Sequence, residues 1–316
     1  MPISKKFIQY LIIIIIVFNI TIGYTKSETK SIRPSFWIDM YRGEPIDYEE
    51  IIDDIINVQV IFLGEVHTIK RHHELQEGII KDLIGRGKSI ILGLEQMEVK
   101  YQNDLDCYNR GEIDFNKLVK KTNWSKRWSN YREYQKIIEL VHQNKGLIIA
   151  LNADSDLIRK IGHSGLKELS KEERKQLPAE IDLNNKDYEK FLKMLLKVHA
   201  MMDPEKLHPV YEAQVTRDEM MSQVIARYIR SNKGEDKIIV VLGGSVHFSY
   251  GLGIPDRLHK RIPSIKDRII LFSESGDLVL SPTEKKMMRK IEITHEDLRF
   301  LKKPISDYLN VIKRKK

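Results

Sequence analysis

The chain contains four continuous apolar runs rich in β-branched residues, at residues 58–63, 90–94, 147–151 and 238–242. Runs of this length are typical of strands buried on both faces, as in parallel sheets. Polar side chains follow each run: Glu65 and His67, then Glu95, then Asn152, then His247. In an open parallel sheet, ligands bind outside the carboxyl ends of the strands. We therefore expect these five side chains to share one cleft.

Segments with helical spacing separate the apolar runs. Apolar residues recur with a period near 3.6 over residues 72–84, 134–142 and 213–229, and residues 269–272 resemble a further strand. Alternation of strands and helices predicts an α/β fold with a central, largely parallel sheet flanked by helices. Residues 101–131 and 165–209 depart from this pattern and are predicted to be helical insertions. No convincing domain boundary is visible, so residues 27–316 are expected to form a single domain.

The N-terminus has the pattern of a targeting segment. Lys5 and Lys6 precede an apolar stretch at residues 7–20, which is the length of a signal-peptide core rather than of a full membrane span. Residues 1–26 are therefore predicted to be a signal peptide or an uncleaved N-terminal anchor. Both alternatives place the body of the protein outside the cytoplasm, in the periplasm or on the cell envelope.

Cysteine content and charge narrow the class of protein. Cys107 is the only cysteine, so the chain has no lipoprotein-type cysteine after its apolar stretch and cannot form an internal disulfide. The net charge is +8, with basic and acidic residues interspersed. This distribution favours a solvated surface, and no zinc-finger spacing or RNA-binding signature indicates a nucleic-acid partner.

The residues after the strands are of types that do chemistry. Carboxylates and imidazoles can transfer protons, bind metals or hold ligands. Glu65, His67, Glu95 and His247 have the right chemistry for a divalent metal with open positions. One hypothesis is therefore a metal-dependent esterase or peptidase, with Glu65 or Glu95 as the base. The structural alternative is that Glu65 caps a helix and His67 satisfies a backbone group.

Two further residues are candidates for ligand binding. Tyr250 follows His247 by three positions in a glycine-rich stretch that would let a planar ligand approach closely. A tyrosine oxygen is a known axial ligand of haem iron, although packing is the alternative role. Arg217 could bind a carboxylate or a phosphate with two hydrogen bonds, or could form an ion pair that orients other groups.

In these motifs the chain resembles the ChaN-like haem-binding family of the Tiki superfamily. The resemblance extends in order from about Gln59 to Leu309. Its motifs are Gly64-Glu65-x-His67 with His73 and Gln76, Gly93-Leu94-Glu95, Gln102, Trp124, Ala150-Leu151-Asn152-Ala153, Gln214 with Arg217-Asp218, Gly244-x-x-His247, Gly253-Ile254-Pro255, and Pro304 with Asp307-Tyr308-Leu309.

The resemblance implies an exported haem-binding protein of iron uptake, which is not primarily an enzyme. It implies that a tyrosine ligates haem iron, a role transferred here to Tyr250, assisted by His247 or His67 from a second subunit. Tyr101, Tyr108 and Tyr131 are alternative ligands, because they also lie near expected pocket walls. Arg217 would meet a haem propionate. It further implies a homodimer with haems at the interface and an outer-membrane haem-uptake system as partner. Related superfamily members hydrolyse their substrates with similar Glu and His residues, so the resemblance leaves both chemistries open.

Overall fold

The computed structural model describes residues 35–198, 204–231, 236–274 and 294–312. The predicted signal peptide or anchor, residues 1–26, lies outside the described residues. None of the described helices combines the length and the apolar character needed to cross a membrane.

The centre of the fold is an eight-stranded mixed sheet with the order β2-β1-β8-β7-β3-β6-β4-β5. All strands from β8 to β5 are parallel to their neighbours within that stretch, whereas β1 is antiparallel to both β8 and β2. The strand bounds are β1 Ser35–Asp39, β2 Glu44–Ile46, β3 Val60–Glu65, β4 Ser89–Glu98, β5 Leu147–Asn152, β6 Lys237–Gly244, β7 Asp267–Phe272 and β8 Tyr308–Ile312. The predicted α/β fold with a largely parallel sheet is therefore confirmed, and its antiparallel edge is an addition.

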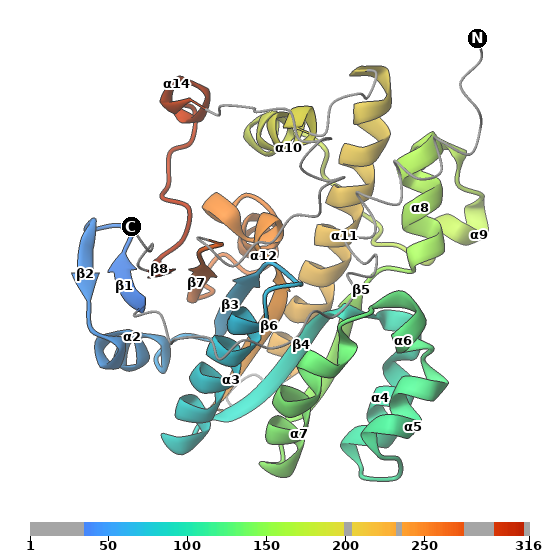
Figure 1. The fold of residues 1–316 in the computed structure, drawn as a ribbon. Coiled ribbons are helices and arrows are strands. Elements are labelled where there is room, and N and C mark those ends of the chain that lie inside the picture. The colour runs from blue at the N-terminus through green and yellow to red at the C-terminus, as the bar shows by residue number, and fades with distance from the viewer. Residues whose placement is uncertain (1–34, 199–203, 232–235, 275–293, 313–316) are drawn as a thin grey trace, which may run out of the picture.

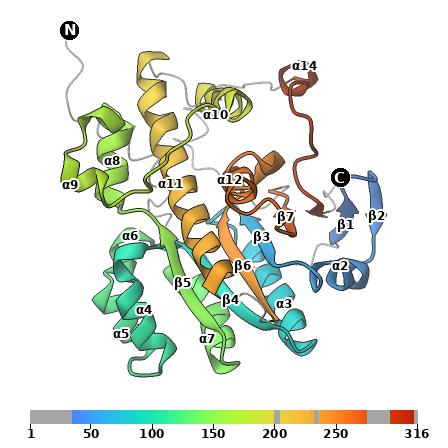
Figure 2. The same cartoon turned by 180° about the vertical axis from the view of Figure 1, so that it is seen from behind.

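Helices cover both faces of the sheet, which gives three layers (Figures 1 and 2). Helices α2 to α7 pack on one face and share a core with Leu63 and Leu94, whereas α8, α11 and α12 pack on the other face with Phe62 and Val241. The bounds are α2 Tyr48–Ile55, α3 Lys70–Gly85, α4 Gln102–Asn109, α5 Phe115–Lys121, α6 Trp124–Arg127, α7 Gln135–Gln143, α8 Ser155–Ser164, α9 Lys171–Arg174, α10 Lys186–Val198, α11 Pro204–Ser231, α12 Ile254–Arg261 and α14 His295–Leu298.

Alternate side chains of one strand enter opposite cores because successive residues of a strand point to opposite faces. Along β3, Phe62 joins the core under α11, and Leu63 joins the core under α3. This alternation continues to the strand ends, so a polar residue there faces either the α3 side or the α11 side. Along β3, a residue an even number of positions from Leu63 faces the α3 side, and a residue an odd number of positions away faces the α11 side.

Additional helical segments lie between the strands in two regions, where the sequence departs from a simple alternation of strand and helix. Between β4 and β5 the chain forms α4, α5, α6 and two 3₁₀ turns, at Val99–Tyr101 and Tyr131–Tyr134. Between β5 and β6 it forms α8, a 3₁₀ turn at Leu166–Glu168, α9, α10 and the long α11. Trp128 and Arg127, in the first of these insertions, lie beside the ends of β3 and β4.

Candidate functional site

The carboxyl ends of β3, β6 and β4 lie side by side and bring four predicted site residues together. Glu65, the last residue of β3, pairs in register with Gly244 of β6. The Gly244 N–H donates a hydrogen bond of 2.6 Å to Oε2 of Glu95, on the adjacent strand β4. His67 and His247 follow directly on β3 and β6. The expected convergence is thus present, at one rim of the sheet.

Glu65 is the centre of the half of this cluster that faces α3. Its side chain is buried, and both carboxylate oxygens accept hydrogen bonds. The donors are Gln76 Nε2 at 2.7 Å, Gln96 Nε2 at 3.0 Å, the hydroxyl of Tyr134, and Nδ1 of His67 at 2.7 Å. His73 Nδ1 lies 3.3 Å from the second oxygen. Burial raises the pKa of Glu65, but the adjacent histidines lower it by a larger amount. The net pKa lies below the usual value for glutamate, so the carboxyl is ionised.

His73 is a buried cation that balances Glu65. Its Nε2 lies 2.9 Å from the carbonyl oxygen of His67 and 3.0 Å from Oε2 of Glu133. Burial lowers its pKa, but the charge of Glu65 and the hydrogen bond to Glu133 outweigh this and raise the pKa to about 10. His73 is therefore protonated at neutral pH. Helix α3 directs it at Glu65 together with Gln76, because residues spaced by three share a helix face.

His247 is the centre of the half that faces α11. Its Nδ1 hydrogen-bonds to Oδ1 of Asp218, and its Nε2 lies 3.2 Å from Oε1 of Glu95. The hydroxyl of Tyr188 donates to the other oxygen of Asp218 at 2.6 Å, and Gln214 Nε2 lies 3.0 Å from Nδ1 of His247. An imidazole held between two carboxylates is most stable as a cation.

The ionisation of this half follows from its geometry. Burial lowers the pKa of His247, yet the charges of Glu95 and Asp218 raise it to about 10. Burial raises the pKa of Glu95, yet His247, His67 and the Gly244 N–H lower it to about 2. At neutral pH the site therefore holds Glu65 and Glu95 as carboxylates.

His67 joins the two halves. Burial lowers its pKa, but the hydrogen bond to Glu65 and the charge of Glu95 raise it. Its Nε2 points toward Gly244, because a Cβ atom added there would lie 3.1 Å from Nε2 and 3.7 Å from Glu95 Oε2. The ring meets the edge of Trp128 at a centroid distance of 4.8 Å. The imidazole of His67 and the half-buried indole of Trp128 thus lie together beside Gly244.

The metal site of the hydrolase hypothesis has no matching arrangement in the described residues. No group of three or more His, Cys, Asp or Glu side chains there is placed to hold a metal ion. Glu65 and Glu95 instead direct their oxygens at imidazole, amide and hydroxyl donors, and each has a histidine of its own.

Arg217 lies on the same face of α11 as Gln214, one turn further along. Burial lowers its pKa, whereas the charges of Glu95, Glu98 and Asp218 raise it. Within the described ranges, no hydrogen bond or ion pair shorter than 4 Å engages its guanidinium. Arg217 therefore lies near the cluster, where the net effect of burial is to lower its pKa.

Tyr250 lies outside the cluster. Its ring packs against Phe191 of α10 at a centroid distance of 5.3 Å, with Val246 and Leu252 nearby. No hydrogen bond or ring contact within the described residues joins it to His67 or His247. Burial raises the pKa of its hydroxyl. Its backbone is left-handed, with φ 59°, and its N–H donates to the Ile305 carbonyl at 2.8 Å.

The remaining candidates have structural contacts. Asn152 donates to the Glu95 carbonyl at 2.9 Å, and His72 Nδ1 accepts the Val66 N–H at 3.0 Å. Sequence reasoning missed Tyr134, Gln96 and Tyr188, which fix Glu65 and Asp218. Gln96 carried a usable signal, because it directly follows Glu95 and therefore points to the other face of β4. Nothing local marked the two tyrosines.

Gly253 holds the loop after His247 in place, and its replacement tests this packing. A Cβ atom on Gly253 would lie 2.2 Å from the His247 carbonyl oxygen. We expect Gly253→Ala to reduce the free energy of unfolding by about 1–3 kcal/mol, as for other overpacked sites, measured by chemical denaturation. Gly78→Ala is the control, since nothing lies within 4 Å of its added Cβ. An unchanged stability for Gly253→Ala would contradict the close contact.

Comparison with known proteins gives the family. The family described as haem-binding uptake, Tiki superfamily, ChaN matches residues 51–258, well over half of the chain. A curated relative, Protein RETICULATA-RELATED 5, chloroplastic, of Arabidopsis thaliana, is 24% identical over 250 residues, which are 72% of this chain and 34% of that protein. The chain thus spans about a third of the length of the curated relative it matches.

One solved structure supports the fold. The structure of cofacial heme binding to ChaN of Campylobacter jejuni has a TM-score of 0.64 at 22% identity, and the match covers 89% of this chain and 97% of that one. A mutant of the erythromycin esterase EreC in its open conformation is more distant, with a TM-score of 0.45 at 12% identity and a match covering 75% of this chain and 76% of that one. The predicted resemblance is confirmed: the chain belongs to the ChaN family of haem-binding uptake proteins in the Tiki superfamily.

Proposed function

We propose that this protein is exported and binds haem for haem or iron acquisition, with Tyr250 as the iron ligand. Family membership supports haem as the ligand class. The apolar residues 7–20 behind Lys5 and Lys6 support export to the periplasm or cell envelope. A homodimer with haems at its interface, served by an outer-membrane uptake system, is part of the proposal.

The observation that carries the proposal is the state of Tyr250. A left-handed backbone costs a residue other than glycine about 1–3 kcal/mol, and both Gly251 and Gly253 are close in sequence. A tyrosine is therefore held at this position despite strain. Its half-buried hydroxyl has no hydrogen-bond partner within the described residues, which leaves the oxygen available to ferric iron.

The surroundings of Tyr250 fit a planar apolar ligand. The ring lies with Phe191, Val246 and Leu252, so a macrocycle bound here would meet apolar side chains. Haem supplies the iron that a tyrosine oxygen can ligate. Burial disfavours the phenolate in the free protein, so we expect the hydroxyl proton to be released on binding.

Arg217 and the histidines are proposed to act on the haem periphery. The Arg217 guanidinium suits a propionate carboxylate. His67 and His247 are each held by carboxylates, which fixes their rings. In this proposal either histidine assists a haem held by the tyrosine of a second subunit, and no catalytic step is assigned to Glu65 or Glu95.

A hemin titration followed by absorbance tests the proposal. Purified full chain is expected to give a stoichiometric Soret shift, and Tyr250→Phe is expected to abolish it. Because the hydroxyl makes no hydrogen bond within the described residues, this variant should change stability by less than about 0.5 kcal/mol. Arg217→Gln should keep the band but weaken binding about tenfold, the scale of one lost charge-assisted hydrogen bond.

Tyr101→Phe and Tyr131→Phe are the matched controls, since both tyrosines are half-buried beside the same rim. They should leave the Soret band of the complex unchanged. A wild-type spectrum identical to free hemin would refute haem binding. Loss of the band in a control variant, with Tyr250→Phe unaffected, would move the ligand to that tyrosine.

A further inference from the structure

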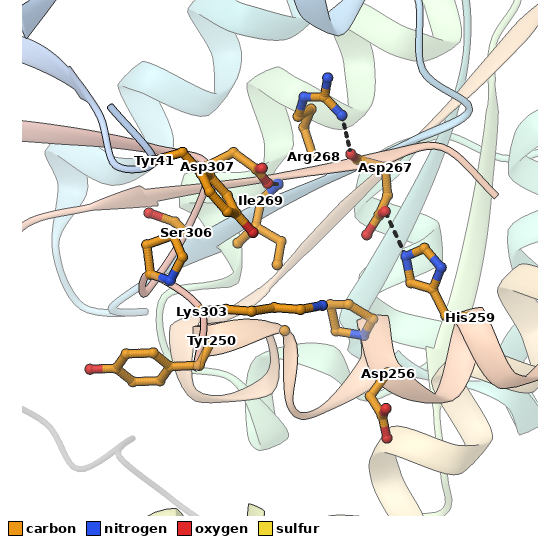
Figure 3. Close-up of a pocket in the computed structure, with 13 residues that line it drawn as sticks. Tyr41, Tyr250, Asp256, His259, Asp267, Arg268, Ile269, Lys303, Ser306 and Asp307 are labelled. Atoms are coloured by element: carbon orange, nitrogen blue, oxygen red, sulfur yellow. Dashed lines mark hydrogen bonds and ion pairs between the residues drawn. The ribbon is translucent and has the colours of Figure 1, made fainter. Parts of the chain in front are cut away.

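A second cavity, separate from the rim cluster, opens beside the start of β7. It encloses about 270 Å³ between β7, α12 and the segment that leads into β8. Figure 3 shows Tyr41 and Asp307 on one side and Lys303 on the other, while the Tyr250 ring points away from the space between them. The volume is slightly below the roughly 300–1,000 Å³ of pockets for drug-sized ligands. A small metabolite is the matching size.

Most charges on the wall of this cavity already have partners. Asp256 pairs with Lys260 at 2.8 Å and Arg268 with Asp54 at 2.6 Å, and Asp267 forms a hydrogen bond of 2.8 Å with Nε2 of His259. The remaining two charges are Asp307 and Lys303. Within the described part of the chain, neither forms an ion pair shorter than 4 Å, with the other or with any third residue.

Asp307 is a half-buried carboxylate that forms no ion pair shorter than 4 Å within the described residues, although the charge of Arg268 acts on it. One oxygen accepts the Ile269 N–H at 2.7 Å. Burial raises the pKa of Asp307 to about 6, and Asp267 adds to the effect. Burial and the charges of Asp307 and Asp267 also raise the pKa of the Tyr41 hydroxyl. Tyr41, Asp307 and Asp267 therefore act on a common space, in which Arg268, already paired with Asp54, offsets part of the negative charge.

Lys303 supplies a positive charge on the opposite wall. Its Nζ lies 3.8 Å from the position of a Cβ on Gly251, and the methyl Cδ1 of Ile269 lies 4.0 Å from the same point. The ammonium of this exposed lysine thus lies over a glycine that leaves room beneath it. Ile269 and Pro255 provide apolar surface between the two charged walls.

We propose that this cavity binds a small zwitterion of the α-amino acid class, with its ammonium group at Asp307 and its carboxylate at Lys303. The two unpaired charges have opposite sign and line opposite walls, so a ligand with both groups satisfies both at once. A neutral, apolar side chain would pack on Ile269 and Pro255. The Tyr41 hydroxyl, on the same side as Asp307 (Figure 3), would accept a hydrogen bond from the ammonium.

Calorimetric titration of the full chain with leucine and its two half-ligands tests this arrangement. 3-Methylbutylamine lacks the carboxylate, and 4-methylpentanoate lacks the ammonium. Leucine should bind at least about tenfold more tightly than either, since each charge-assisted contact contributes on that scale. Asp307→Asn keeps an acceptor for the Ile269 N–H, and it should reduce the affinity for leucine to that for 4-methylpentanoate. Lys303→Met should reduce it to that for 3-methylbutylamine.

The crossed variants separate binding from folding. Each variant should weaken the binding of one half-ligand and leave the binding of the other unchanged. A general loss of structure would weaken the binding of both. Equal binding of leucine and both half-ligands, or no binding of leucine, would overturn the proposal. So would an Asp307 carboxyl that titrates below pH 4 by ¹³C NMR, assigned by its loss in Asp307→Asn, because Lys303 would then already neutralise it.

Discussion

Replacing Glu65 with alanine is expected to reduce the free energy of unfolding by about 3–5 kcal/mol, the range for removing one partner of a buried ion pair. The carboxylate is 1% exposed and is the common acceptor for donors from the end of β3, α3, β4 and the turn before α7. Without it, the protonated His73 loses one of its two carboxylate partners and is left with Glu133, and the hydroxyl of Tyr134 loses its acceptor. Denaturant unfolding at pH 7 measures the change.

Two control variants separate the effect of the Glu65 charge from the effect of its side-chain volume. Glu65→Gln keeps the shape and one acceptor oxygen, so it should lose less stability than Glu65→Ala while still removing the buried counter-anion of His73. Glu74→Ala removes an exposed carboxylate from α3, and should cost less than about 0.5 kcal/mol. Equal effects of Glu65→Ala and Glu74→Ala would mean that Glu65 is not the hub of the cluster.

The rim of the sheet was predictable because its signals are local. Apolar runs long enough to be buried on both faces marked β3, β4, β5 and β6, and parallel strands share the edge at which they end. Glu65, His67, Glu95 and His247 could thus be placed together without coordinates. The edge strands carry no such run: in β1 only Trp37 is buried, and β1 is defined by its pairing with β8, far away in sequence.

The partners of the site residues were less predictable than the residues themselves. Whether Asp218 would orient a histidine or pair with Arg217 depended on the rotation of α11 against β6, and the structure pairs it with His247. Tyr134 reaches Glu65 from an insertion whose path no short motif defines. The left-handed backbone of Tyr250 is also invisible in sequence, because glycine is the residue that normally marks this conformation.

Replacing His247 with alanine is expected to cost about 3–5 kcal/mol at pH 6.5, since it removes the imidazole that lies between Glu95 and Asp218, two neighbouring buried acidic side chains. The exposed His163, at the end of α8, gives the control: His163→Ala should change stability by less than about 0.5 kcal/mol. Chemical denaturation of the wild type and both variants provides the measurement.

The pH dependence of this difference distinguishes an ion pair from simple packing. The pKa of His247 is raised from 6.5 to about 10 in the folded protein, so its electrostatic contribution is complete below pH 6.5 and is lost as the pH rises through 10. The pKa of Glu95 is lowered from 4.5 to about 2, so its contribution is complete above pH 4.5 and is lost toward pH 2. The stability difference between wild type and His247→Ala should therefore be largest between pH 4.5 and 6.5 and should shrink on both sides. The titration of His73 cancels in this difference, because that side chain belongs to the Glu65 half and is present in both proteins. A difference that stays constant from pH 5 to pH 10 would show that His247 contributes only volume, and would remove the argument that the two carboxylates hold a charged imidazole.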